Sequence, residues 1–380
     1  MFERSILHLD MDTFFVSVER LRNSELQGKP IIIGGHSDRA VVASCSYEAR
    51  TFGVRSAMPV KMALRLCPEA LVIRGDMDAY IQESRNVTEI IKEEAPLFEK
   101  SSIDEFYLDL TGMDRYVGCW KWSGELRHRI IKETGLPISS GLSINKLVSK
   151  ISTGEAKPNG AKLIEAGMEK PFLDPLSIRK IPSLGKVTYK KLRFMGVKDI
   201  RTLRHIPHQL LQREFGKHGL SLWKKANGID NSPVVSYREK KSMSSERTFH
   251  EDTIDVIFLK SKLTSLVMKL AYELRQSARL TACITVKIRY SDFNTYSKQK
   301  HIPYTASDRA LIDFALELFD KLYQRRQLVR LIGVRFSKLV YGHQQMELFT
   351  DTQEDDKLLK VMDDIRKRFG MGAVKRGSCG

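Results

Sequence analysis

The sequence predicts an α+β protein of several domains, and three observations lead to this fold class. First, the chain of 380 residues is too long for one ordinary hydrophobic core, which suggests two to four domains. Second, short strand-like and longer helix-like hydrophobic patterns are mixed through the first part of the chain. Third, the pattern becomes wholly helical near Pro171 and returns to mixed strands and helices after residue 241.

The first part of the chain contains a strand, a tight turn and a helix in quick succession. Residues 6–9 are apolar and end at Asp10, and helical spacing of apolar residues begins at Phe14. Further strands are expected at 29–35, 40–45, 71–73 and 138–142, and helices at 58–67, 79–94, 123–133 and 145–152. In the helix at 79–94 the inward residues are expected to be Ile81, Val87, Ile90 and Ile91.

The rest of the chain divides into a helical segment, a linker and a second mixed region. Residues 171–230 have the pattern of short helices, and the polar, basic stretch 231–241 is typical of a linker. The pattern after it is β-α-β-β-α-β, a split βαβ order, at 242–249, 255–278, 281–290, 295–303, 307–323 and 330–337. An amphipathic helix is predicted at 354–369, with apolar residues Leu358, Leu359, Val361, Met362, Ile365 and Phe369.

Net charge indicates a polyanionic partner. The formal charge is +17, and residues 237–338 hold 20 Lys and Arg against 11 Asp and Glu, a net of +9. No apolar run approaches the roughly 18 residues of a membrane span, and the N-terminus has no signal-peptide pattern. The five cysteines form no C-x-x-C pair, which fits a reducing cytosol. Nucleic acid is therefore the expected partner.

Three carboxylates stand out in this basic chain. Asp10 ends the first strand, and Asp104 with Glu105 interrupts the alternation of 101–111 at a predicted hairpin turn. If the two strands are neighbours in one sheet, the three acids converge and repel unless a cation lies among them. Hard oxygen ligands select Mg²⁺, and two such ions can stabilise the attacking and leaving oxygens of a phosphoryl transfer.

Five ordered segments carry a resemblance to a known family: LDMDTFFVSVE (9–19), SYEARTFGVRSAMP (46–59), SSIDEFYLDLT (101–111), GLSINKLVSKIST (141–153) and AKPNG (156–160). They resemble the Y-family DNA polymerases, in particular the DNA polymerase IV group, which copies past damaged template bases. The resemblance covers about 1–345 and implies a right-hand polymerase. Its parts are a ferredoxin-like palm (1–10 and 77–166), small fingers (11–76), a helical thumb (167–230), a linker (231–241), a β-α-β-β-α-β little finger (242–341) and a tail (342–380).

The resemblance implies roles for the acids. Asp10 and Asp104 match the two metal-bridging aspartates, and Met11 would add its backbone carbonyl. Glu105 matches the catalytic glutamate near the primer 3′-hydroxyl, and the implied cofactor is two Mg²⁺ ions per site. For Asp12 we expect a structural or positioning role instead.

The resemblance also implies a nucleotide site. Phe15 matches the steric gate that rejects a 2′-hydroxyl by clash; its neighbour Phe14 lies about 100° around the helix, where a core position is possible. The other residues implied at the nucleotide are Phe14, Ser44, Tyr47, Arg50 and Lys157.

DNA and clamp contacts follow from the same resemblance. The segment from Ile181 resembles a helix-hairpin-helix whose backbone N–H groups bind a DNA phosphate, with Ser183 where the family usually has glycine. The implied DNA-binding residues are Ser183, Gly185, Lys186 and, in the little finger, Arg335. The peptide 345–349 resembles the motif that docks bacterial polymerases on the sliding clamp, through Gln345, Leu348 and Phe349.

The expected function is thus a template-directed translesion DNA polymerase of low fidelity that acts on primer–template DNA and deoxynucleoside triphosphates. We expect a cytoplasmic monomer without membrane contact. One alternative is a nucleotidyl cyclase, which shares a ferredoxin-like palm with two metal-binding acids but needs no thumb or basic C-terminal domain. Another is a DNA-binding scaffold without catalysis, which would be expected to lack Asp10, Asp104 or Glu105.

Overall fold

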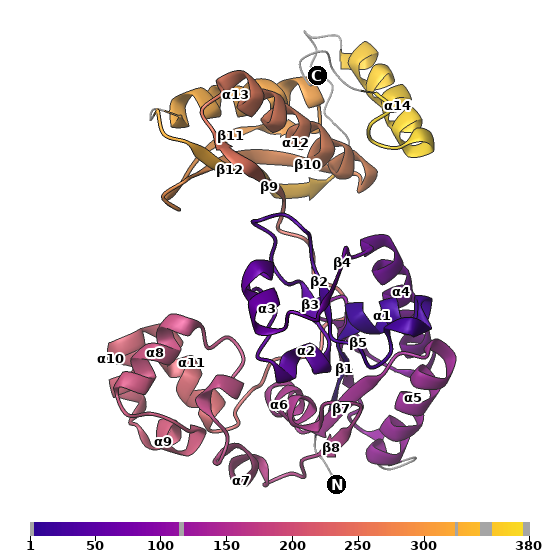
Figure 1. The fold of residues 1–380 in the computed structure, drawn as a ribbon, viewed down its shortest axis with the longest axis vertical. Coiled ribbons are helices and arrows are strands. Elements are labelled where there is room, and N and C mark those ends of the chain that lie inside the picture. Colours follow the sequence, from indigo (N-terminus) through magenta and orange to yellow (C-terminus); the bar gives the residue numbers. More distant parts are fainter. Residues whose placement is uncertain (1–3, 114–117, 324–325, 343–351, 375–380) are drawn as a thin grey trace. The chain divides into compact units, whose positions relative to one another are not determined.

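The computed structural model describes residues 4–113, 118–323, 326–342 and 352–374, with the side chains of the last helix described from residue 357. The chain divides into two compact units, Met1–Arg238 and Glu239–Gly380, each with its own sheet and core (Figure 1). The mixed composition of strands and helices confirms the α+β class.

A five-stranded sheet forms the centre of the first unit, in the order β5-β6-β1-β7-β8. Its central strand β1 is almost wholly buried and pairs antiparallel with both neighbours. The strands are β1 (Ile6–Met11), β5 (Phe98–Lys100), β6 (Glu105–Asp109), β7 (Ile138–Ser143) and β8 (Ala161–Leu163). The predicted turn between two strands near Asp104 is present, since β5 and β6 pair antiparallel on either side of it.

Helices cover both faces of this sheet. On one face, α4 (Met77–Glu94) and α5 (Cys119–Thr134) share a core with Leu7 and Leu9 of β1. On the other face, α6 (Lys146–Ala156) packs closely on β7 because Gly141 has no side chain: a Cβ there would lie 2.1 Å from the Ser152 hydroxyl. This close approach brings the lysines of α6 near the end of β1.

One detail of α4 differs from the expectation. Val87, Ile90 and Ile91 are buried as predicted, but Ile81 is exposed. Tyr80 takes the inward position instead, because its hydroxyl donates a hydrogen bond of 2.6 Å to Glu19 inside the unit. A polar tip with a partner allows tyrosine to be buried at a position that hydrophobicity assigned to isoleucine.

Two further parts complete the first unit. A three-stranded sheet, ordered β3-β2-β4, consists of β2 (Ile31–Ile33), β3 (Ser44–Cys45) and β4 (Leu71–Ile73), with α1 (Phe14–Arg22), α2 (Tyr47–Thr51), α3 (Val60–Leu66) and the 3₁₀ turn η1 (Ser24–Leu26). The helical segment has its own hydrophobic cluster and contains α7 (Glu169–Leu173), η3 (Ile178–Lys180), α8 (Lys186–Phe194), α9 (Ile200–His205), α10 (His208–Phe215) and α11 (Lys217–Ala226). The start of the predicted linker is anchored, since Val234 packs on Ile6 and Tyr107.

The second unit has the predicted β-α-β-β-α-β order. Its sheet is ordered β11-β10-β12-β9, and α12 and α13 enclose the core against one face. The elements are β9 (Ser242–Thr253), α12 (Val256–Gln276), β10 (Arg279–Tyr290), β11 (Thr295–Thr305), α13 (Asp308–Leu322) and β12 (Val329–Tyr341).

The predicted C-terminal helix is present as α14 (Thr352–Phe369). Its inward side chains are Leu359, Asp363 and Arg366, whereas Leu358, Val361 and Phe369 are exposed. The predicted apolar spacing therefore identified Leu359 and the partly buried Met362 and Ile365, but not the buried charged residues Asp363 and Arg366. No helix of the described residues is both long and apolar enough to cross a membrane.

Candidate active site

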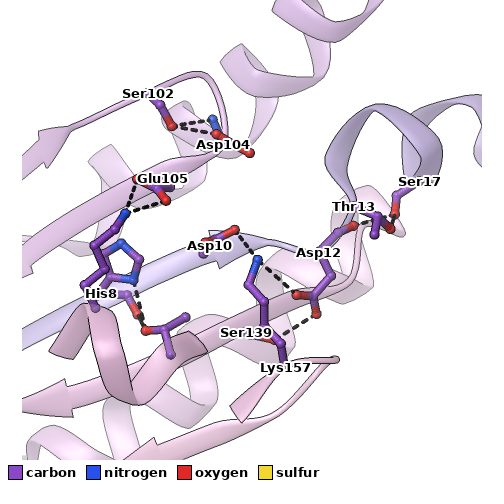
Figure 2. Close-up of polar contacts among 12 residues, drawn as sticks. His8, Asp10, Asp12, Thr13, Ser17, Ser102, Asp104, Glu105, Ser139 and Lys157 are labelled. Atoms are coloured by element: carbon purple, nitrogen blue, oxygen red, sulfur yellow. Dashed lines mark hydrogen bonds and ion pairs between the residues drawn. The ribbon is translucent and has the colours of Figure 1, made fainter. Parts of the chain in front are cut away.

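The pairing of β1 with β6 brings the three predicted carboxylates to one place. Asp10 lies opposite Glu105 in the antiparallel register, and the Met11 N–H donates a 3.0 Å hydrogen bond to the carbonyl oxygen of Asp104. Figure 2 shows the Asp10 and Glu105 side chains near the ends of the neighbouring strands, with Asp104 on the adjoining turn. Two strands separated by more than 90 residues in sequence thus present their acids together.

Each of these acids already has a polar partner. The Lys157 ammonium lies 2.6 Å from Asp10 Oδ1, and the Lys150 ammonium bonds both carboxylate oxygens of Glu105, at 2.5 and 2.6 Å. The Ser102 hydroxyl donates to Asp104 Oδ1 at 2.5 Å. Lys150 was not among the predicted site residues, although it lies within the segment 141–153 and one helical turn beyond Lys146 on α6.

The environment of Asp10 shows that negative charge is crowded here. Burial raises the pKa of Asp10 to about 6, against an ordinary value of 3.8, and repulsion from Glu105 and Asp104 adds to the rise. Lys157 opposes this shift but does not cancel it. A carboxylate in such surroundings is stabilised by additional positive charge.

The donor set fits a divalent cation with hard-oxygen preference. Among the described residues, no three His, Cys, Asp or Glu side chains are already grouped as metal ligands. Asp10 and Glu105 are instead paired with Lys157 and Lys150. Asp10 and Glu105 already bind ammonium groups and Asp104 accepts from a hydroxyl, and three neighbouring carboxylates are the kind of ligands that Mg²⁺ takes.

A pocket of about 210 Å³ lies beside the acids. It brings together most of the residues predicted at the metal and nucleotide, namely Asp10, Met11, Phe14, Phe15, Ser44, Arg50, Asp104 and Lys157. Sequence reasoning missed three small residues that also line it, Thr13, Ala43 and Ser56. They carry no charge or aromatic ring that would have marked them.

The two phenylalanines of α1 have different surroundings. Phe14 is buried in the core, whereas Phe15 is partly exposed and stacks on Tyr80, with ring centroids 4.3 Å apart and planes 12° from parallel. This stack fixes the Phe15 ring at the pocket. The sharp turn before α1, with Thr13 at a φ of 42°, sets the direction in which the helix leaves β1.

Asp12 links three segments around the pocket. Its carboxylate is buried and accepts hydrogen bonds from the Tyr47 hydroxyl (3.3 Å), the Ser139 hydroxyl (2.8 Å) and the Asn159 N–H (2.5 Å). Burial, with the nearby Asp12 charge, raises the pKa of Tyr47, so the phenol remains a hydrogen-bond donor. The Arg50 guanidinium lies over the Tyr47 ring, 5.1 Å from its centroid. Asp12 thereby holds Tyr47 beside the loop that carries Lys157.

The predicted DNA contacts lie elsewhere. In the helical segment Ser183 adopts a φ of 69°, the left-handed conformation that favours glycine, and Gly185 precedes α8 without a side-chain cap. Lys186 is the first residue of α8. Arg335 belongs to the second unit and is exposed on β12. The clamp-peptide residues Gln345, Leu348 and Phe349 lie outside the described residues.

Comparison with known proteins connects this geometry to one family. Three family models match: the impB/mucB/samB family at 9–154, its C-terminal domain at 240–348, and the DNA polymerase-iota thumb domain at 179–230. The chain is 38% identical over 378 residues to DNA polymerase IV of Dehalococcoides mccartyi strain CBDB1, covering 98% of this chain and 97% of that protein.

Solved structures agree with the family models. A Y-family DNA polymerase chimera matches with a TM-score of 0.78 and 26% identity over 89% of this chain and 100% of that one. Dbh DNA polymerase in an insertion ternary complex matches with a TM-score of 0.65 and 25% identity over the same shares. These likenesses confirm the right-hand polymerase fold predicted from the sequence. The chain therefore belongs to the impB/mucB/samB family, the Y-family of DNA polymerases.

Proposed function

We propose that this protein is a template-directed DNA polymerase of the translesion type, which adds deoxynucleotides to a primer 3′-end with low fidelity. The observation that carries the proposal is the meeting of Asp10, Asp104 and Glu105 beside a pocket lined by Arg50 and Lys157. Negative groups for cations and positive groups for phosphates lie side by side, as phosphoryl transfer requires. Membership of the Y-family supports the same reaction.

The other parts of the chain have corresponding proposed roles. The palm is 1–10 with 77–166, the fingers 11–76, the thumb 167–230 and the little finger 242–341. The likeness to Dbh DNA polymerase in an insertion ternary complex supports primer–template DNA and a deoxynucleoside triphosphate as substrates. We further propose that the protein acts as a cytoplasmic monomer, and that Gln345, Leu348 and Phe349 dock it on a bacterial sliding clamp.

Asp10, Asp104 and Glu105, with the Met11 carbonyl, would hold two Mg²⁺ ions. Bound there, magnesium would supply a lower pKa for the primer hydroxyl and charge neutralisation for the phosphates. The sheet supplies the position: hydrogen bonds between the strands fix the backbone that carries Asp10 and Glu105 before the substrate arrives.

Arg50, Tyr47 and Lys157 would bind the triphosphate. Lys157 exchanges its carboxylate partner for phosphate oxygens once the acids bind other cations, and Asp12 keeps the loop around it in place through the Asn159 N–H. The protonated Tyr47 hydroxyl would give up its bond to Asp12 to donate to a phosphate, and Arg50 offers a planar fork of donors. Three donors from two segments orient the triphosphate for in-line attack.

Phe15 would select the sugar. Its ring is held at the pocket by the stack on Tyr80, so moving aside for a 2′-hydroxyl would break this stacking contact. Phe14, buried in the core, supports the helix from behind. A rigid aromatic at this place rejects ribonucleotides by steric clash.

Primer extension with Mg²⁺ tests the proposal. Asp104→Ala and Glu105→Ala should each lower extension by at least about 100-fold while DNA affinity stays nearly unchanged. Asp109→Asn is a matched control, since Asp109 lies at the other end of β6, and it should extend normally. Only nucleotides complementary to the template should be incorporated. Cyclic nucleotide formation without template would favour a cyclase instead, and retained extension in the two alanine variants would refute the assigned site.

A further inference from the structure

The C-terminal helix α14 is attached to the second unit by a buried cluster of four charges. Asp363 and Arg366 of α14 meet Arg275 of α12 and Asp308 at the start of α13. All four side chains are largely buried. The two positive and two negative charges cancel, which lowers the cost of burying the cluster.

The two arginines of this cluster are not equally satisfied. Arg275 bonds both oxygens of Asp363 through Nε (2.6 Å) and Nη2 (2.8 Å), and its Nη1 donates to Asp308 (2.6 Å) and to the Ala306 carbonyl (2.8 Å). Arg366 uses only Nη1, at 3.3 Å from Asp363 and 3.6 Å from Asp308. Among the described residues, Nε and Nη2 of Arg366 have no hydrogen-bond partner although both atoms are buried.

The unpaired Nε and Nη2 donors of Arg366 indicate which kind of group could bind there. Nε and Nη2 are the same pair of donors with which Arg275 grips a carboxylate in this cluster. A buried cationic fork without an acceptor is costly, so a native arrangement of this kind indicates a missing anion. Guanidinium forks match the two oxygens of a carboxylate or phosphate.

Arg366 lines a pocket of about 610 Å³ in the second unit. The walls come from the edge strand β9, from α12 and from the end of α14 with the residues after it. Their polar and apolar members are Ser245, Glu246, Arg247, Thr248, Ser261, Lys262, Ser265, Leu266, Met268, Lys269, Arg366, Met371, Gly372 and Val374. A pocket of this size is typical of small-ligand sites.

Positive charge dominates the walls of this pocket. Arg247, Lys262 and Lys269 join Arg366, and the acid that also lines it, Glu246, is paired with Lys287 outside the pocket. The Lys262 ammonium lies over the Phe258 ring, 5.1 Å from its centroid. Several cations around one buried fork favour a multiply charged oxyanion over a single carboxylate.

Part of the pocket lies on the side of the sheet opposite to Arg335. Arg247 of β9 pairs across the sheet with Ile332, which belongs to the core under the helices. Arg335, three residues further along β12, pairs with Ser244 and therefore points to the other face. The pocket is therefore open to both sides of the edge strand β9, since Glu246 and Thr248, which also line it, alternate to the same face as Ser244.

We propose that this pocket binds a phosphate group, gripped by the free edge of Arg366 and neutralised by Lys262 and Lys269. The phosphate can come from a small phosphorylated ligand or from a nucleic-acid strand, and both present the same oxyanion. Because Arg366 belongs to α14, the bound phosphate joins α14 to α12 and β9. Occupancy therefore stabilises the docked C-terminal helix.

Titration calorimetry of the full chain with inorganic pyrophosphate, in chelator and low salt, tests this site. The double variant Lys262→Ala/Lys269→Ala should weaken binding at least tenfold, without touching the four-charge cluster. Lys260→Ala is the matched control: Lys260 lies on the same helix, bonds Asp320 and does not line the pocket, and its loss should change affinity less than twofold. Binding at Arg50 and Lys157 contributes equally to every variant.

Arg366→Lys keeps the charge but removes the fork, and should also weaken pyrophosphate binding. Hydrogen exchange of α14 should slow on adding pyrophosphate to the wild type and not to the double variant. A 5′-phosphorylated single-stranded oligonucleotide serves as the second probe. Variant-sensitive binding of the oligonucleotide that pyrophosphate displaces assigns the phosphate to nucleic acid, and an effect on pyrophosphate alone assigns it to a small ligand. Equal binding of both probes by the wild type, the double variant and Arg366→Lys, or an equal loss in Lys260→Ala, overturns the proposal.

Discussion

Replacement of Asp10 by asparagine should stabilise the first unit while abolishing primer extension. Asparagine has the shape of a neutral aspartic acid and still offers Lys157 a carbonyl oxygen. A rise of the Asp10 pKa from 3.8 to about 6 means that the charged carboxylate costs the folded unit ~3 kcal/mol. The variant removes this cost together with the charge that the reaction needs.

The gain in unfolding free energy of Asp10→Asn should increase as pH rises. Because the folded-state pKa of Asp10 is raised, the carboxyl group is neutral in both states below about pH 4, where the variant should match the wild type. The wild type then loses stability as pH rises from 3.8 to about 6, and above that the full difference should appear. Added Mg²⁺ should narrow the difference in unfolding free energy between Asp10→Asn and the wild type, since the ion stabilises the wild type more than the variant.

Urea unfolding followed by tryptophan fluorescence measures this effect selectively. All three tryptophans, Trp120, Trp122 and Trp223, lie in the first unit, so the transition reports that unit alone. Glu165→Gln, at an exposed carboxylate of the same unit, should leave the transition unchanged. If Asp10→Asn is no more stable than the wild type at pH 7.5, or if its gain persists at pH 4, the raised pKa of the buried Asp10 is refuted.

Three further predictions concern the sugar gate, the hairpin and the clamp peptide. Phe15→Ala should admit ribonucleotides in single-nucleotide insertion assays, whereas unchanged sugar selectivity would place the gate elsewhere. Ser183→Gly should relieve left-handed backbone strain and stabilise the first unit by up to about 1 kcal/mol; an unchanged or lower urea midpoint would argue against strain. Leu348→Ala with Phe349→Ala should abolish stimulation of synthesis by a sliding clamp but leave basal extension intact, and an equal loss without clamp would indicate misfolding.

The sequence was sufficient for the architecture because its hydrophobic periods are regular. The alternation around Asp104 and Glu105 predicted a strand pair, and the split βαβ order was visible in residues 242–337. That Asp10 would lie opposite Glu105 could be stated only as a condition, because sheet register depends on contacts between distant segments. The family motifs were the reason to expect that the strands of Asp10 and Glu105 are neighbours in one sheet.

Partners of the acids could not be predicted from periodicity. Lys150 bonds Glu105 only because α6 packs closely on β7, where Gly141 permits the approach. Similarly, the burial of Tyr80 in place of Ile81 depends on a hydrogen bond to Glu19 from another helix. Such side-chain pairs arise from tertiary packing, and a linear pattern of apolar residues does not predict them.

The inward face of the last helix, α14, was also not fully predicted, and the pocket beside it could not be predicted for the same reason. Apolar spacing in α14 pointed to Leu358, Leu359, Val361, Met362, Ile365 and Phe369; Leu359 is buried, Met362 and Ile365 are partly buried, and Asp363 and Arg366 lie on the same inward side. Hydrophobic burial accounts for Leu359 but not for the two charged residues, which pair with Arg275 of α12 and Asp308 of α13. A pairing that leaves one guanidinium edge buried without a partner is incomplete, and a bound oxyanion is the group that would complete it.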